Sequence, residues 1–310
     1  MRVAIIGRTE VLFETARRLK AAGFEIPLIV TAKEAPDYKV TAEDFKNLAA
    51  EYGAEYIFTQ KINQPDIIAK IKSLGTIDIS ISVNYSGVIA QEVIDLFPMG
   101  ILNAHAGDLP RYRGNACPAW AILNGEEKIG LCIHKMIGGE LDSGLILGRE
   151  FYYPQVNTRI QEVYDWIFAR VPDMFLQAME ELKQDPNYFL EKQSTDPKNA
   201  LRCYPRIPED GRINWTRSNI DVLRLINVSS EPYIGSFAFY GGERIAIWRA
   251  ELVEEPEIYL AVPGQVAKIN SDGSVEIICG EGKIRITEAA INEKRGKPSQ
   301  FIKSIRQRLT

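Results

Sequence analysis

One stretch of the sequence, residues 101–114, brings together side chains that could do acid–base chemistry. It contains Asn103 and His105, and the chain has only two histidines in 310 residues. The apolar residues 99–102 predict the end of a buried strand, and the Pro and Gly that follow prevent the strand from continuing. Because Asn103 and His105 are two residues apart, their side chains point to the same face of a strand. They lie at the carboxyl end of the strand, where α/β sheets place their binding and catalytic sites. The alternative is a structural role, with Asn103 capping a turn and His105 packed in the core.

A glycine-rich loop at residues 138–144 supplies two carboxylates, Glu140 and Asp142. An imidazole, an amide and a carboxylate together suit acyl transfer to an amine. The imidazole can take the proton that the attacking amine loses, and the carboxylate can orient the ring and hold its useful tautomer. The amide of Asn103 can stabilise the oxyanion of the tetrahedral intermediate. No Ser or Cys stands in an obvious setting for a nucleophile, which favours direct transfer. In the structural alternative, Asp142 only caps a turn.

The composition is that of a soluble globular protein, with 45% hydrophobic and 25% charged residues. The net charge of −4 disfavours a nucleic-acid partner, because phosphate binding uses clustered Lys and Arg. The four cysteines are widely spaced without a C-x-x-C pair, so we interpret them as reduced thiols rather than zinc ligands or disulfides. The chain shows no secretory signal and no apolar run of about 18 residues, which predicts a cytoplasmic protein that does not bind membranes.

The first half of the chain alternates short apolar strands with amphipathic helices. We expect strands at 2–7, 26–30, 56–58, 77–83 and 99–103, and helices at 11–22, 41–52, 65–74 and 90–96. This alternation predicts an α/β fold with a doubly wound, mainly parallel sheet. The turn Gly7-Arg8-Thr9 does not match G-x-G-x-x-G, so a dinucleotide-binding fingerprint is absent.

The second half of the chain has a different pattern of predicted helices and strands. A helix at 120–124 and a strand at 130–135, where His134 has a packing or structural role, precede a long helix at 158–183 that we expect to be interrupted at Pro172. Residues 185–208, rich in Pro, Asp, Asn and Lys, are typical of a linker. We then expect short strands at 237–240, 244–251, 264–269, 275–279 and 283–288. They predict a smaller β-rich, OB-like domain. The expected domains are 1–184 (catalytic) and 209–310 (β-rich), joined by the linker 185–208.

Several spaced motifs resemble a known family. They are Asn-x-His at 103–105, Leu-Pro-x-Tyr-Arg-Gly at 109–114, Pro-x-Trp at 118–120, Asn-Gly-Glu at 124–126, Gly-x-x-x-His-x-Met at 130–136 and Asp-x-Gly at 142–144. In this order they resemble the folate-dependent formyltransferases, which formylate amines with N10-formyltetrahydrofolate. Two further motifs are Arg-x-Pro-Glu-Asp-Gly-x-Ile-x-Trp at 206–215 and Pro-x-x-Gly-x-Phe at 232–237. These are similar to the linker and C-terminal domain of two branches, the methionyl-tRNA formyltransferases and the sugar-nucleotide N-formyltransferases.

The resemblance implies roles for particular residues. Asn103, His105 and Asp142 match the catalytic triad of the family. The pterin of the folate is held by backbone groups after the strand at 77–83 and by the loop before Asp142, which correspond here to Tyr85, Ser86, Gly87, Val88, Ile89, Gly139 and Glu140. An ordinary strand-to-helix turn is the alternative at 85–87. The family implies no metal ion.

Substrate contacts are expected beside the catalytic strand. Arg111 and Arg113 are candidates for binding phosphates, although an arginine here can also serve structure. Tyr112 and Trp120 are candidates for stacking on a base or a sugar, although packing in the protein is the favoured interpretation of each. Exposed faces of the C-terminal half could also pair in a homodimer.

Departures from the family pattern bear on the substrate. The tRNA branch usually has Ser-Leu-Leu-Pro where this chain has Gly-Asp-Leu-Pro at 107–110, and the acidic Asp108 disfavours RNA. The loop at 31–40 carries Lys33 and Lys39 against Glu34 and Asp37, whereas a tRNA enzyme is expected to carry a more basic insertion. We therefore expect an N-formyltransferase for a nucleotide-linked amino sugar in lipopolysaccharide or other glycan synthesis, without a nucleic-acid partner.

Three other functions stay open. The first alternative is methionyl-tRNA formyltransferase, which the complete C-terminal domain favours. A folate- or nucleotide-binding protein without transfer activity is disfavoured, because such a protein does not need the full set of Asn103, His105 and Asp142. A hydrolase that releases formate would leave the C-terminal domain without an evident role.

The triad makes a direct prediction about activity. His105→Ala and Asp142→Asn should each lower the rate of formyl transfer by about 10²- to 10⁴-fold, the usual loss when general acid–base catalysis is removed. The measurement is the transfer rate, with circular dichroism to check that the variants fold. Near wild-type turnover of His105→Ala would contradict the mechanism.

Overall fold

A computed structural model of the chain describes residues 1–35, 38–254, 257–292 and 294–310. Asp37, which entered the charge comparison for the loop at 31–40, lies outside these residues. No helix in the described ranges has the length and apolarity to span a lipid bilayer. The chain forms two compact units: Met1–Cys117 with Gly130–Tyr152 and Asp165–Cys203, and Pro118–Ile129 with Tyr153–Tyr164 and Tyr204–Thr310.

The first unit is built on one twisted sheet. Its strands are β1 (Arg2–Gly7), β2 (Glu25–Thr31), β3 (Glu55–Phe58), β4 (Ile79–Val83), β5 (Ile101–His105), β7 (Ile129–Lys135) and β8 (Ile146–Tyr152). They lie in the order β3-β2-β1-β4-β5-β7-β8. The pairs from β3 to β5 are parallel, whereas β5 and β7 are antiparallel. The prediction of an α/β fold with a mainly parallel sheet is confirmed, but β5 continues past Asn103 to His105, and β8 was not predicted.

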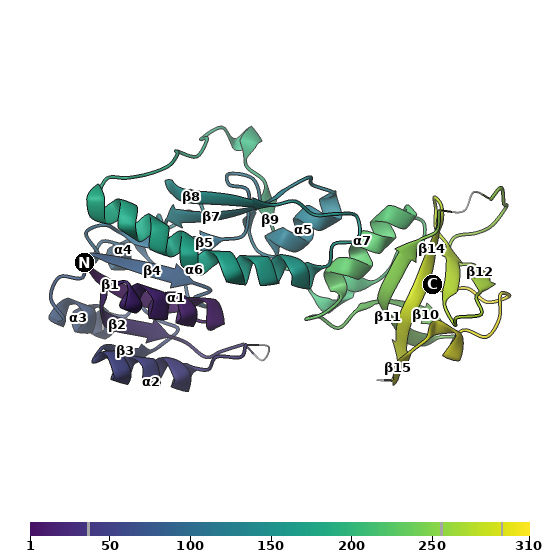
Figure 1. The fold of residues 1–310 in the computed structure, drawn as a ribbon, viewed down its shortest axis with the longest axis horizontal. Coiled ribbons are helices and arrows are strands. Elements are labelled where there is room, and N and C mark those ends of the chain that lie inside the picture. Colours follow the sequence, from purple (N-terminus) through teal and green to yellow (C-terminus); the bar gives the residue numbers. More distant parts are fainter. Residues whose placement is uncertain (36–37, 255–256, 293) are drawn as a thin grey trace. The chain divides into compact units, whose positions relative to one another are not determined.

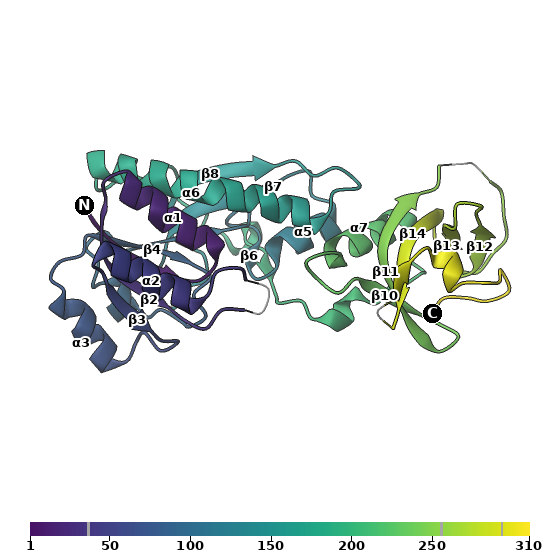
Figure 2. The ribbon, with the colours of Figure 1, turned by 60° about the horizontal axis from the view of Figure 1, so that its bottom comes forward.

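Helices cover both faces of this sheet (Figures 1 and 2). One face packs through Ala4, Ile6 and Leu28 against α3 (Pro65–Ser73) and α4 (Gln91–Ile94). The other face is covered by α1 (Glu10–Ala21), α2 (Ala42–Tyr52) and α6 (Ile160–Gln184). The rings of Phe13 and Phe45, 5.5 Å apart, join α1 to α2, and an ion pair between Arg18 and Asp173 joins α1 to α6.

The predicted interruption at Pro172 is wrong, because α6 runs through this residue. A proline inside a helix removes one backbone hydrogen bond at a cost of about 3 kcal/mol or more. Val171 and Phe175, on either side of it, are fully buried. The packing of the helix therefore outweighs the local cost of the proline.

The segment that we predicted as a linker packs against the first unit as far as Cys203. The N–H of Ile146 donates to the carbonyl of Glu191, and β9 (Arg202–Cys203) pairs in parallel with β6 (Arg113–Gly114). A short 3-10 helix, η1 (Pro197–Asn199), lies between these contacts. The domain boundaries at 184 and 208 stay a prediction.

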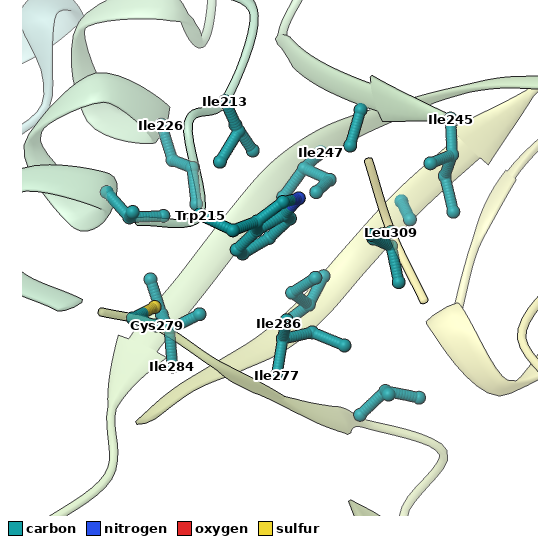
Figure 3. Close-up of a cluster of buried hydrophobic side chains, with 14 of the residues drawn as sticks. Ile213, Trp215, Ile226, Ile245, Ile247, Ile277, Cys279, Ile284, Ile286 and Leu309 are labelled. Atoms are coloured by element: carbon teal, nitrogen blue, oxygen red, sulfur yellow. The ribbon is translucent and has the colours of Figure 1, made fainter. Parts of the chain in front are cut away.

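The second unit holds an antiparallel sheet, as predicted. Its strands are β10 (Ser236–Tyr240), β11 (Glu243–Leu252), β12 (Val266–Ile269), β13 (Val275–Ile278), β14 (Lys283–Ile291) and β15 (Lys294–Gly296). The order is β10-β11-β14-β13-β12, with the unpredicted β15 paired to β14. Helix α7 (Asn219–Ser229) packs on β11, and Figure 3 shows Trp215 at the centre of the core, beside Ile226 and Ile247.

Helix α2 begins at the residue that the sequence indicates. Thr41 is its N-cap: the Thr41 hydroxyl accepts a hydrogen bond from the N–H of Asp44 at 3.3 Å, and the Asp44 carboxylate accepts one from the N–H of Thr41 at 2.7 Å. This reciprocal pair satisfies two backbone donors that the helix itself leaves free.

Loss of this cap should be measurable as stability. Thr41→Ala should lower the free energy of unfolding by about 1 kcal/mol, because one N–H at the start of α2 loses its partner. Thr41→Ser keeps the hydroxyl and should stay close to the wild type in the same denaturant titration. Equal stability of Thr41→Ala and Thr41→Ser would contradict the assigned cap.

Candidate active site

The structure brings the predicted triad together around one carboxylate. Asn103 and His105 lie on β5, and the antiparallel register places His134 of β7 opposite Asn103. The Oδ2 atom of Asp142 is 3.5 Å from Nδ1 of His105, and its Oδ1 atom is 3.5 Å from Nε2 of His134. Both histidines are buried, so Asp142 lies between two imidazoles in a largely desolvated site.

His134 is the residue that sequence reasoning missed. We predicted packing or a structural hydrogen bond, and the buried ring does form hydrogen bonds, but it also contacts two members of the triad, with Nε2 3.3 Å from Nδ2 of Asn103. The signal that could have found it was the pairing of two antiparallel strands, each with one of the two histidines. That pairing places His134 beside Asn103, but the sequence predicts each strand separately.

The tautomer of His105 is set by a backbone carbonyl. Nε2 of His105 is 2.6 Å from the carbonyl oxygen of Tyr112. A carbonyl only accepts hydrogen bonds, so Nε2 carries the proton and Nδ1 of the neutral ring carries the lone pair. Burial lowers the pKa of His105 below its ordinary value, an effect that the charge of Asp142 opposes. The ring is therefore neutral at pH 7, and Nδ1 is the atom that can take up a proton.

A tight turn of the backbone places the Tyr112 carbonyl next to His105. Tyr112 has a φ of 56°, in the left-handed region that residues with a side chain rarely occupy. A Cβ atom on Gly107 would lie 2.2 Å from the Tyr112 oxygen and 2.6 Å from Nε2 of His105. Only glycine allows the three groups to approach this closely.

Asp142 is held as a carboxylate. The N–H of Gly114 donates to its Oδ2 at 2.9 Å, and the side chain of Gln193 donates to its backbone carbonyl at 2.8 Å. Burial alone raises the pKa of Asp142, but the imidazoles of His134 and His105 and the Gly114 N–H lower it to about 2. A fixed negative charge beside Nδ1 of His105 stabilises that ring once it is protonated.

Residues next to the two segments that we expected to hold the folate, 85–89 and 139–140, are in contact. The N–H of Gly138 donates to the Gln91 side chain at 2.8 Å, and a Cβ on Gly138 would lie 2.5 Å from the Gln91 nitrogen. The loop around Gly139 and Glu140 is therefore next to the segment 85–91. Both loop residues are exposed, with open space where a Cβ on Gly139 would lie.

Within the first of these segments, the residues differ in what they can offer a ligand. Val88 is 79% exposed and Ser86 is also exposed, whereas the Ile89 side chain is buried in the core and leaves only its backbone. Tyr85 is half-buried, and its hydroxyl donates to the carbonyl of Thr59 at 2.9 Å. Position 87 requires glycine, because a Cβ there would lie 2.4 Å from the Gln60 oxygen.

The side chains expected to contact the substrate differ in their exposure. The ring of Tyr112 is buried, which agrees with the favoured packing and not with stacking on a base or sugar; its backbone carbonyl lies at His105. The guanidinium of Arg113 donates to Gln193 at 2.7 Å and supports the loop of Asp142. Arg111 is exposed, with its guanidinium 5.6 Å from the centre of the Tyr112 ring.

Trp120 lies in the second unit, on α5 (Cys117–Asn124). Its indole N–H donates to the carbonyl of Tyr204 at 2.8 Å, and the guanidinium of Arg206 lies 6.0 Å from its ring. Two polar contacts thus fix the ring within its own unit.

Asp108 is a structural residue. Its carboxylate forms an ion pair with Arg149, which also donates to the carbonyl of Leu109 at 2.7 Å and pairs with Glu191. One guanidinium therefore serves two carboxylates, Asp108 and Glu191. The expectation that Asp108 disfavours RNA stays a prediction, but this carboxylate is engaged by Arg149.

Among the described residues, no cluster of three or more His, Cys, Asp and Glu side chains could hold a metal ion. The chemistry at hand is that of an imidazole base, a carboxylate and an amide donor, and it fits acyl transfer to an amine.

Comparison with known families identifies the class. A family model described as "Formyl transferase" matches residues 1–158, and one described as "Formyl transferase, C-terminal domain" matches residues 206–306. The chain belongs to the formyl transferase family, whose members transfer formyl groups and use formyl-tetrahydrofolate.

The individual relatives differ in the substrates that their names give. A methionyl-tRNA formyltransferase from Acetivibrio thermocellus is 25% identical over 299 residues, covering 95% of this chain and 93% of the relative. An N-formyltransferase from Helicobacter canadensis, solved with folinic acid and dTDP-3-aminofucose, has a TM-score of 0.64 at 15% identity, over 92% of this chain and 97% of that one. HypX from Aquifex aeolicus has a TM-score of 0.62 at 18% identity, and the match covers 97% of this chain. It covers 46% of the HypX chain.

The turn at Gly107 can be tested directly. Gly107→Ala should lower the rate of formyl transfer by about 10²-fold or more, because a methyl group displaces the Tyr112 carbonyl and releases the His105 tautomer. Gly148→Ala is the matched control, since its Cβ would lie at an ordinary 3.7 Å from Met174. Equal rates for the two variants would contradict the assigned role of the turn.

Proposed function

We propose that this chain is an N-formyltransferase that moves the formyl group of N10-formyltetrahydrofolate to the amine of a nucleotide-linked amino sugar. Asn103, His105 and Asp142 are its catalytic residues. The observation that carries the proposal is the Asp142 carboxylate, 3.5 Å from Nδ1 of a neutral, buried His105. This arrangement suits the uptake of a proton from an attacking amine.

The folate supplies an activated formyl carbon. The protein residues accept the proton of the amine and stabilise the charge that develops on the formyl oxygen. Nδ1 of His105 takes the proton that the amine loses and would return it to N10 of the folate when the bond between the formyl carbon and N10 breaks. The Tyr112 carbonyl keeps Nε2 protonated throughout. Asp142 stabilises the imidazolium that forms, because it is an ionised carboxylate in a desolvated site. An N–H of the Asn103 amide stabilises the negative charge that develops on the formyl oxygen.

The residues that would hold the folate are those of the two adjacent segments, Tyr85–Ile89 and Gly139–Glu140. The Gly138–Gln91 contact joins them beside the loop that carries Asp142. Exposed Val88 offers an apolar contact, and the peptide groups of the segments can satisfy the hydrogen bonds of a pterin ring.

Charge and loop length support a small acceptor. The chain carries a net charge of −4, and the segment between β2 and α2 spans only residues 32–41. In its described part, Lys33 and Lys39 are accompanied by Glu34. The diphosphate of a sugar nucleotide needs one or two basic groups, and Arg111 is an exposed candidate.

A second candidate function is methionyl-tRNA formylation, which one surface feature favours. Residues 294–310 contain six Lys or Arg and no Asp or Glu, and all six are exposed: Lys294, Arg295, Lys297, Lys303, Arg306 and Arg308. Such a basic stretch is suited to phosphate contacts. The Acetivibrio relative named above is also a tRNA-modifying enzyme.

Mass spectrometry can identify the substrate by detecting which acceptor gains a formyl group. The chain and N10-formyltetrahydrofolate are incubated with dTDP-, UDP- and GDP-linked amino sugars, and in parallel with methionyl initiator tRNA. We expect one formyl group on a sugar nucleotide and none on the tRNA. Formylation of the tRNA alone, with a rate that falls steeply with salt, would overturn the sugar assignment.

The pH dependence of the reaction tests the roles of His105 and Asp142. Neutral His105 is the active form and its pKa is lowered, so kcat/KM should fall only as the pH drops below the ordinary histidine value of 6.5. Asp142→Asn removes a charge that raises the pKa of His105, so the residual activity should fall at a still lower pH. The acceptor amine titrates identically in both enzymes, and a shift of the acid limb to higher pH in Asp142→Asn would contradict the assignment.

A further inference from the structure

His134 is a buried imidazole that the mechanism above does not use. Its Nδ1 atom is 2.9 Å from the carbonyl oxygen of Lys135, and its side chain is 2% exposed. Because a carbonyl only accepts, Nδ1 of the neutral ring carries the proton, and Nε2 is a hydrogen-bond acceptor.

The neighbours of Nε2 are consistent with this tautomer. Nδ2 of Asn103 is 3.3 Å away and can donate to the lone pair. Oδ1 of Asp142 is 3.5 Å away, beyond the range of a normal N–H···O bond. The opposite tautomer would leave the Nδ1 lone pair facing the Lys135 oxygen at 2.9 Å, which is repulsive. The Lys135 carbonyl therefore makes His134 an acceptor for Asn103.

This bond fixes the Asn103 amide. A side-chain amide has a donor edge and an acceptor edge of nearly the same shape, and a half-turn about its Cβ–Cγ bond exchanges them. The formyl oxygen only accepts, so stabilising its charge requires that Asn103 present an N–H rather than its own oxygen. With one N–H bound to His134, the direction of the second N–H is determined.

We propose that His134 is a positioning residue for formyl transfer, acting through the Asn103 amide. The proposal deepens the function proposed above and rests on it: His134 touches neither the formyl group nor the acceptor amine. It selects which edge of Asn103 faces the reacting atoms.

The hydrogen-bond arrangement has a spectroscopic test that does not depend on activity. The chain has only two histidines, so ¹⁵N-histidine labelling gives two ring systems, which His105→Gln and His134→Gln assign. We expect the Nδ1–H tautomer for His134 and the Nε2–H tautomer for His105. An Nε2–H tautomer at His134 would overturn the proposal.

A kinetic cycle separates positioning from a general structural role. His134→Leu removes the acceptor, whereas His134→Gln can present its side-chain oxygen in the same place. We expect His134→Leu to lower kcat by up to about 10²-fold, the scale of losing one oxyanion donor, with the KM for the folate little changed. His134→Gln should restore most of this loss.

The same substitution is then made in an Asn103→Ala background. If His134 acts through Asn103, His134→Leu should change kcat little there, because residues in one hydrogen-bond network are not additive. The same fold loss in both backgrounds would overturn the proposal. A wild-type chain that formylates neither sugar nucleotides nor tRNA would instead overturn the proposed function, while the tautomer of His134 would still decide the bond to Asn103.

Discussion

The site depends on one constraint: a carboxylate, Asp142, is kept ionised between two buried imidazoles. A buried charge is costly unless its partners are fixed, and here the fold fixes them. The antiparallel register of β5 and β7 sets the spacing of His105 and His134. The loop that carries Asp142 requires glycine at position 144, because a Cβ there would lie 1.9 Å from the Lys135 oxygen. The Gly114 N–H and the Gln193 side chain then hold the loop in place.

Backbone carbonyls set the protonation pattern of the site. The Tyr112 carbonyl fixes the proton of His105 on Nε2, and the Lys135 carbonyl fixes that of His134 on Nδ1. The lone pair of His105 is then on Nδ1, the ring nitrogen that lies 3.5 Å from Asp142. The site is prepared to receive a proton, and a proton taken up at Nδ1 of His105 immediately gains the carboxylate as its partner. In the proposed mechanism, this partner favours proton uptake by a buried imidazole of lowered pKa.

The sequence predicted the parts of this arrangement that depend on local pattern. The alternation of strands and helices indicated the sheet, and the even spacing of Asn103 and His105 placed them on one face of β5. It did not reveal the role of His134, which depends on the pairing of two strands, or that of the Tyr112 carbonyl, which belongs to the backbone and has no side-chain signal. The sequence also did not reveal that Asp108 pairs with Arg149, which lies far away along the chain. Pro172 fails as a helix breaker because tertiary packing outweighs its local cost.

The most direct test of the account follows the formyl carbon itself. N10-[¹³C]formyltetrahydrofolate is mixed with the wild-type chain and an amino-sugar nucleotide, and ¹³C NMR records where the label goes. The account predicts that the label moves from the folate to an amide on the sugar, and that His105→Ala leaves it on the folate. Label released as free formate, at a rate unaffected by the acceptor, would contradict transfer to an amine and identify the site as that of a hydrolase.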